Sequence, residues 1–219
     1  MPKLIVAALP IDGQWKKIDP RVIETVQGCD LLIAEERKTA KRLLAVSGCP
    51  DKPLELLNEH SSDSNRAEIV KKIKEVCCTA LVSDAGTPCI ADPDYRLVDQ
   101  CIKDGVEVLS LPGASSITAA LSVSGFPSDR FIFLGFPPKK GETRRRFFTN
   151  LENSRITSIF LERPYALKRT LEDMVHIRKD ISVSIDIGSE NAVNIRGHIA
   201  SILKQIEGRK AAFVVVVSP

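Results

Sequence analysis

The chain has 219 residues, of which 43% are hydrophobic and 27% charged, and 31 basic residues against 28 acidic ones give a net charge of +3. This composition is typical of a globular protein and excludes disordered and collagen-like chains. No apolar run is long enough to span a bilayer, and the start lacks the apolar core and cleavage site of a secretory signal. We therefore expect a cytoplasmic protein without a membrane segment.

The cysteines and histidines do not form a metal-binding pattern. Six cysteines are present without a Cys-x-x-Cys pair, and His60, His176 and His198 are isolated from them and from one another. Metal sites need such ligands at short, fixed spacing. We expect no metal, and reduced cysteines that pack mostly as small hydrophobic residues.

Strand-like and helix-like segments alternate along the whole chain, which predicts an α/β fold. In the first half we expect strands at 4–9, 30–34, 79–83 and 106–111, and helices from Pro20 and at 37–46, 64–78 and 95–103. After a small-residue helix at 114–124, strands are expected at 131–136, 157–161, 181–186 and 211–217, and helices at 142–151, 165–177 and 197–206. A boundary near residue 115 divides the chain into domains 1–114 and 115–219.

Two loops that follow predicted strands are the best local signals of a binding site. The first runs from Ser83 through Asp84, Ala85, Gly86 and Thr87 to Pro88, and the second covers 111–116. Ligands of α/β sheets bind at the carboxyl ends of strands, and glycine allows the backbone to approach a ligand closely. The alternative is an ordinary strand-to-helix loop in which Asp84 caps a turn.

Several common functional motifs are absent. No Gly-x-Gly-x-x-Gly follows the first strand, and no phosphate-binding loop of the Gly-x-x-x-x-Gly-Lys-Ser/Thr type occurs. Neither Ser115 nor Ser116 lies in a Gly-x-Ser-x-Gly motif. The usual dinucleotide site, a P-loop and serine hydrolase chemistry are therefore not predicted.

A basic segment follows the first strand of the second half. Five lysines and arginines lie within the eight positions 139–146. Such a cluster gives sequence-independent affinity for the phosphates of a nucleic acid. The alternative is that these residues form a solvated loop and the start of a helix, without binding a ligand. With two tyrosines and one tryptophan in the chain, a surface for stacking several bases is not evident.

A series of motifs also occurs in one order along the chain. It comprises 83–88, Asp92-Pro93, 95–98, 111–114, Leu121-Ser122 through Gly125, 127–131, Gly135-Phe136 and Pro138-Lys139. This series resembles the ribosomal RNA small subunit methyltransferase I family, within the tetrapyrrole methylase superfamily of class III S-adenosylmethionine enzymes. The resemblance runs from the first strand to the last and is most specific from 80 to about 171.

The resemblance implies two α/β domains of the tetrapyrrole methylase type with the cofactor cleft between them, in a homodimer. It also implies transfer of a methyl group to the ribose 2′-hydroxyl of a cytidine in small-subunit (16S) rRNA. By position, the residues expected to bind S-adenosyl-L-methionine are Leu9, Pro10, Asp84, Ala85, Gly86, Thr87, Pro88, Ile90, Ser115, Ser116, Leu161, Glu162, Asp186, Ile187, Ala211 and Ala212.

The sequence departs from the family pattern at three places. The family's Thr-Pro-Ile-Gly-Asn-Leu is replaced at 9–14, where the Pro-Ile pair remains and Gly-Asn is lost, and its Ala-Glu-Asp-Thr-Arg is altered at 34–38. The family's Ala-Arg-Glu-Leu-Thr-Lys is replaced at 184–189, and the usual C-terminal extension is missing after Pro219. These segments are where the RNA and the target ribose are expected, so the donor site is better preserved than the acceptor site.

Glu35 is the candidate base that takes the hydroxyl proton, because it follows a strand and is retained in the family comparison. The alternative is a surface carboxylate paired with a nearby Lys or Arg. The candidates for RNA phosphates are Lys38, Lys139, Lys140, Arg144 and Arg145. Two other functions stay open: methylation of another acceptor, a tetrapyrrole or other small molecule, and a non-catalytic RNA-binding relative.

Overall fold

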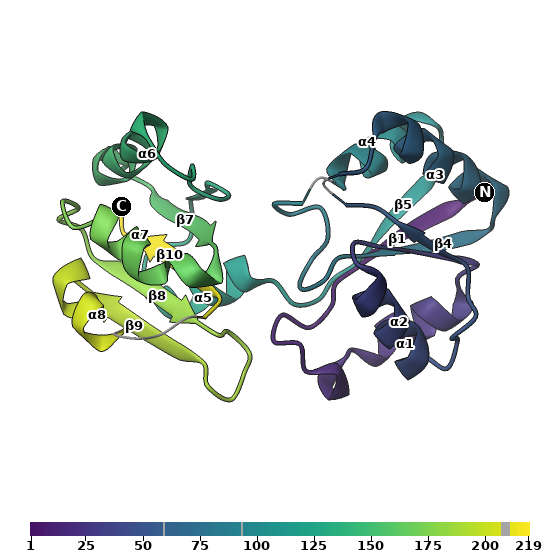
Figure 1. The fold of residues 1–219 in the computed structure, drawn as a ribbon, viewed down its shortest axis with the longest axis horizontal. Coiled ribbons are helices and arrows are strands. Elements are labelled where there is room, and N and C mark those ends of the chain that lie inside the picture. The colour runs from purple at the N-terminus through teal and green to yellow at the C-terminus, as the bar shows by residue number, and fades with distance from the viewer. Residues whose placement is uncertain (59, 93, 207–210) are drawn as a thin grey trace. The chain divides into compact units, whose positions relative to one another are not determined.

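The computed structural model describes every residue of the chain except 59, 93 and 207–210. Pro93, part of one motif quoted above, lies outside the described residues. The chain divides into two compact units, Met1–Ser115 and Ser116–Pro219, each built on its own sheet (Figure 1).

The first unit contains a parallel sheet with strand order β3-β2-β4-β1-β5. Its strands are β1 (Lys3–Ala7), β2 (Leu31–Ala34), β3 (Leu54–Leu56), β4 (Cys78–Val82) and β5 (Glu107–Leu111). Strands β2 and β4 are buried along their whole length, which explains their continuous apolar sequences.

Helices cover both faces of this sheet. They are α1 (Pro20–Gly28), α2 (Arg37–Val46), α3 (Asp63–Glu75) and α4 (Tyr95–Lys103), with a 3-10 turn at Trp15–Lys17. The apolar faces of α1 and α2 join one core cluster, and those of α3 and α4 join another. Pro20 opens α1 at the position that tolerates proline, where the Asp19 side chain accepts a hydrogen bond from the Arg21 amide. Because every strand is parallel, all carboxyl ends lie at one edge of the sheet.

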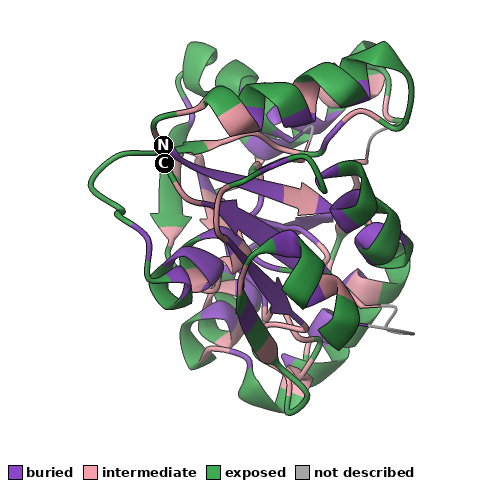
Figure 2. Ribbon diagram, turned by 90° about the vertical axis from the view of Figure 1, so that its left-hand side faces the viewer, coloured by how far each residue is buried: buried purple, intermediate pink, exposed green. Residues whose placement is uncertain are grey.

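The second unit contains a mixed sheet with strand order β6-β7-β10-β8-β9. Its strands are β6 (Phe131–Phe133), β7 (Thr157–Glu162), β8 (Ile181–Ile185), β9 (Val193–Gly197) and β10 (Phe213–Val217). Only the β6–β7 pair is parallel among these described strands. Strands β8 and β10 are buried from end to end, and buried residues appear purple in Figure 2.

The helices of the second unit are α5 (Ser116–Ser124), α6 (Glu142–Asn153), α7 (Leu167–Asp173) and α8 (Ile199–Gln205), with a 3-10 turn at Pro164–Ala166. Helix α5 packs on one side of the sheet through Ile117, Ala120 and Leu121. Helices α6, α7 and α8 share the larger apolar cluster on the other side. This cluster includes Met174, which is fully buried, as expected for a methionine in a core.

Some sequence-based expectations differ from the structure. Strands β3 and β9 were not predicted, because one has three residues and the other is a partly exposed edge strand. The helix expected at 165–177 is a 3-10 turn followed by α7, which ends at Asp173. Val175, an apolar residue beyond that end, is 59% exposed. The helix expected from 197 begins at Ile199, because 193–197 forms β9.

Two other observations concern the chain as a whole. Within the described residues, no helix combines the length and apolar character needed to cross a membrane. The six cysteines are all unpaired, and Cys29, Cys78 and Cys101 are buried.

Candidate functional site

Three loops interlock at the carboxyl edge of the first sheet. Leu9, after β1, and Gly86, after β4, form a two-way backbone bridge, with N–H···O distances of 2.9 and 3.0 Å. The Thr87 hydroxyl donates to the carbonyl of Ala114, after β5, at 3.0 Å. The two loops singled out from the sequence therefore lie together, and the segment after β1 joins them.

Glycine is required where these loops approach most closely. A Cβ on Gly113 would lie 2.9 Å from the Cβ of Ala8, which is closer than two carbon atoms can pack. Gly86 has a φ of +77°, and a Cβ there would lie 3.2 Å from the Ile11 side chain. The glycines thus allow the loops to hold each other in place.

Glu35 lies directly after β2 at the same edge of the sheet. It is half-buried, and its Oε2 accepts a hydrogen bond from the Asp84 amide at 3.2 Å. Burial raises the pKa of the Glu35 carboxyl; the Asp84 hydrogen bond opposes this, and the nearby carboxylates of Asp92 and Asp84 add to it. Among the ion pairs of the described residues none involves Glu35, so the alternative of pairing with a Lys or Arg finds no support.

Two aspartates beside Glu35 have buried oxygen atoms without hydrogen-bond partners in the described structure. They are Asp84, at Oδ1, and Asp94, at both carboxylate oxygens. Asp94 is 1% exposed, and burial, together with the charges of Glu35 and Asp92, raises its pKa to about 7. Sequence reasoning missed Asp94, because an aspartate just before a helix resembles an ordinary N-cap. The described residues contain no group of three or more His, Cys, Asp or Glu side chains that could hold a metal ion.

The remaining candidates of the first unit flank the interlocked loops. Pro10 is partly buried after Leu9, and Ile90 is 46% exposed in the loop that follows Pro88. Ser115 ends the first unit, and Ser116 begins α5. Pro10 and Ile90 thus add apolar groups, and Ser115 a small polar one, to the loops of the first unit.

The candidates of the second unit gather at one end of its sheet. Strand β10 runs antiparallel to β7 and β8, so its start lies beside their ends. The Asp186 amide donates to the Ala212 carbonyl at 2.9 Å, and Phe213 pairs with both Glu162 and Ile185. Leu161, Glu162, Asp186, Ile187, Ala211 and Ala212 are therefore near neighbours in the fold.

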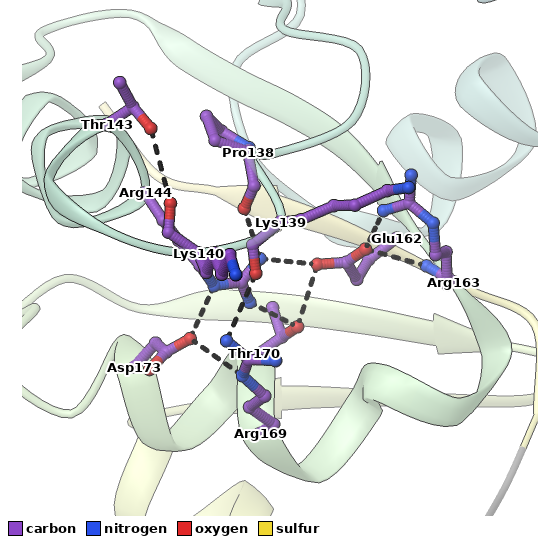
Figure 3. Close-up of polar contacts among 10 residues, drawn as sticks. All are labelled: Pro138, Lys139, Lys140, Thr143, Arg144, Glu162, Arg163, Arg169, Thr170 and Asp173. Atoms are coloured by element: carbon purple, nitrogen blue, oxygen red, sulfur yellow. Dashed lines mark hydrogen bonds and ion pairs between the residues drawn. The ribbon is translucent and has the colours of Figure 1, made fainter.

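Arg144, on α6, is the centre of a buried polar network (Figure 3). Its Nη1 donates to Glu162 Oε2 at 2.8 Å and to the Pro138 carbonyl at 3.0 Å. Its Nε donates to Asp173 at 2.6 Å, and its Nη2 donates to the Thr170 hydroxyl at 3.0 Å. All three guanidinium nitrogens are thus engaged inside the protein.

This network changes the roles expected of two residues. Arg144 is 5% exposed, so its charge is not available to RNA phosphates in this structure. Glu162 is also 5% exposed, and it accepts hydrogen bonds from Arg144 and Thr170 at Oε2 and from the Arg163 amide at Oε1. The side chains of both residues are therefore engaged in hydrogen bonds within the second unit. By contrast Lys38, Lys139, Lys140 and Arg145 are exposed.

The sequence matches a known family over most of its length. The model of the Tetrapyrrole (Corrin/Porphyrin) Methylases matches residues 3–202. The "Ribosomal RNA small subunit methyltransferase I" of Thermotoga maritima is 37% identical over 96% of this chain and 94% of its own length. The protein of the same name from Haemophilus influenzae is 40% identical over 78% of this chain, but the match spans only 60% of its length.

Solved structures show the same fold. Diphthine synthase has a TM-score of 0.76 at 16% identity, over 98% of this chain and 89% of its own. The uroporphyrin-III-C-methyltransferase of Thermus thermophilus has a TM-score of 0.61 at 14% identity, over 100% and 94% of the two chains.

The fold and the sequence match define a S-adenosylmethionine-dependent methyltransferase of the tetrapyrrole methylase type. Within that class, the chain belongs to the ribosomal RNA small subunit methyltransferase I family.

Proposed function

We propose that the protein transfers the methyl group of S-adenosyl-L-methionine to the 2′-hydroxyl of a cytidine ribose in small-subunit (16S) rRNA. The names of its relatives indicate small-subunit rRNA as the acceptor. The observation that carries the proposal is the position of Glu35, a half-buried carboxylate held by the Asp84 amide beside the interlocked loops. Removal of a hydroxyl proton requires such a base near the acceptor.

The residues at the strand ends fit a donor of this kind. Asp84 as a residue is only partly buried, so its carboxylate can accept a hydrogen bond from a hydroxyl or amino group of the ligand. Pro10 and Ile90, which keep exposed apolar surface in the loops after β1 and β4, supply apolar contacts to the donor. We assign donor binding to Leu9, Pro10, Asp84, Ala85, Gly86, Thr87, Pro88, Ile90, Ser115, Ser116, Leu161, Asp186, Ile187, Ala211 and Ala212. Glu162 is left out because its oxygens are already hydrogen-bonded.

The chemistry divides between the donor and the protein. Bound S-adenosylmethionine supplies an electrophilic methyl group on a sulfonium. Glu35 would take the proton of the ribose hydroxyl at a carboxylate oxygen as the new oxygen–carbon bond forms, while the carbon–sulfur bond of the donor breaks and the neutral thioether, S-adenosylhomocysteine, leaves. The raised pKa of Glu35 makes it a stronger base than an exposed glutamate. The rigid loops supply the in-line geometry, because positioning accounts for much of the rate of such a transfer.

We further propose that the protein works as a homodimer in the cytoplasm. The edge strands carry exposed apolar side chains: Leu109 on β5 is 42% exposed, and Phe131 and Ile132 on β6 are 41% and 45% exposed. Exposed apolar groups on edge strands favour association with another chain. Size-exclusion chromatography with light scattering tests this, and a mass near 24.1 kDa at micromolar concentration would contradict it.

The activity is tested with radiolabelled S-adenosylmethionine and small ribosomal subunits from cells that lack the corresponding methyltransferase. Nuclease digestion and mass spectrometry then map the label. We expect label on one cytidine ribose. Donor binding by calorimetry without label on the subunits would overturn rRNA as the acceptor and favour another one, as the altered segments 10–14 and 185–189 would suggest.

A further inference from the structure

The loop at 138–140, which precedes α6 and carries Lys139 and Lys140, is held in place by hydrogen bonds to its backbone carbonyls. The carbonyl of Pro138 accepts from Arg144, and the carbonyl of Lys139 accepts from Arg169 Nη2 at 3.1 Å (Figure 3). The Thr143 hydroxyl donates to the next carbonyl, that of Lys140, at 3.4 Å. Three successive carbonyls thus accept hydrogen bonds from side chains, while the side chains of Lys139 and Lys140 remain exposed.

A cavity of about 590 Å³ opens between this loop, α6 and α7. Arg145 lies on the α6 wall and Arg169 on the α7 wall, and both side chains are well exposed, at 79% and 60%. The buried Phe148 forms part of the lining, and His176 lies at the end that follows α7. We call this cavity, with Lys139 and Lys140 of the loop beside it, the basic groove.

The positive charge of the basic groove is available to a ligand. Arg145 pairs with Glu142 at 2.8 Å and Arg169 with Asp173 at 4.0 Å, but both are exposed pairs within one helix. Such pairs contribute little, so they do not prevent either guanidinium group from contacting a phosphate, and Arg169 can do so while its Nη2 keeps the hydrogen bond to the Lys139 carbonyl. Asp173 is held by the buried Arg144, whose Nε lies 2.6 Å from it. The charge of Asp173 is therefore already compensated from within the protein.

We propose that the basic groove binds the phosphodiester backbone of the RNA substrate, with Arg145 and Arg169 contacting phosphates from its two walls. This inference rests on the proposed function. Guanidinium groups bind phosphate oxygens in pairs of hydrogen bonds, and two of them with two lysines suit a chain of phosphates better than one small anion. The aromatic ring in the lining is buried, so the groove offers backbone contacts instead of base stacking. Arg169 and His176 were not singled out from the sequence, because they lie far from the basic segment along the chain.

The test measures binding of a fluorescent fragment of small-subunit rRNA to the full chain over a range of salt concentrations. In Arg145→Gln/Arg169→Gln we expect affinity to fall about 10-fold or more, and the slope of log K against log salt to fall by about 0.7 for each lost contact. Calorimetry should give an unchanged affinity for S-adenosylmethionine. The matched control is Lys168→Gln/Lys204→Gln, which removes the same charge from exposed positions of the same unit outside the cavity.

The outcomes separate the possible failures. Equal RNA affinity in the groove variant and the control would overturn the basic groove while leaving the proposed function intact. Absence of RNA binding by the wild-type chain would overturn both. A separate calorimetric titration uses inorganic phosphate as the probe. Phosphate binding that is lost in the groove variant while RNA binding is kept would identify a free-phosphate site and overturn the inference.

Discussion

Replacement of the buried Arg144 by leucine should destabilise the second unit strongly. The change leaves Glu162 as a buried carboxylate that has lost its main partner, and its side chain is 2% exposed. Removing one partner of a buried ion pair costs about 3 to 5 kcal/mol. Arg163 remains 3.3 Å from the other oxygen of Glu162, and Asp173 is 37% exposed and can be hydrated. We therefore expect the lower end, about 3 kcal/mol, or about 6 to 12 °C in the melting temperature of a chain of this size.

Far-UV circular dichroism during urea and thermal unfolding measures this effect, while the fluorescence of Trp15, the single tryptophan, reports on the first unit. The control is Arg146→Leu on the same helix, where the side chain is 75% exposed and the expected change is within about 0.5 kcal/mol. The double variant Arg144→Leu/Glu162→Leu should lose clearly less than the sum of the single changes, because no buried charge is left alone. Additive losses, or an Arg144 variant as stable as the control, would refute this account of the network.

Three further predictions concern the first unit. Glu35→Gln should lower methyl transfer about 10²- to 10⁴-fold with unchanged donor affinity, measured by initial rates and calorimetry; an active variant would exclude Glu35 as the base. Asp94 has a pKa raised from 3.8 to about 7, so between these pH values the folded state keeps a proton that the unfolded state loses. The free energy of unfolding should therefore fall as pH rises from about 4 to about 7, by about 4 kcal/mol at most. Asp94→Asn should remove this part of the pH dependence in urea unfolding, and parallel curves for the two proteins would contradict it. Gly113→Ala should lower the free energy of unfolding by about 1 to 3 kcal/mol and weaken S-adenosylmethionine binding, because the added Cβ meets Ala8. The control Gly28→Ala places its Cβ in open space and should leave donor affinity, measured by calorimetry, unchanged.

The sequence predicted the segments whose burial is continuous or periodic. The helices at 37–46 and 95–103 have the expected bounds, and the fully buried β2, β4 and β10 lie where apolar runs indicated them. Short edge strands were missed, because partial burial leaves a weak pattern in a strand of three to five residues. Pattern alone also overextended the helix after 165, since Val175 is apolar but faces solvent.

The sequence by itself determined the α/β class, the family and the loops at the strand ends, because these depend on local patterns and on motifs contiguous in the chain. The tertiary structure decided which polar side chains are exposed and available to bind a ligand. Arg144 and Arg145 are equivalent in a basic run, yet one is 5% exposed among carboxylates and the other has a side chain 79% exposed. Asp94 resembles a helix cap but is buried beside Glu35, with no hydrogen-bond partner for its carboxylate among the described residues. Burial and charge pairing arise from segments far apart in the sequence, so only the folded chain determines which of these side chains can meet a ligand.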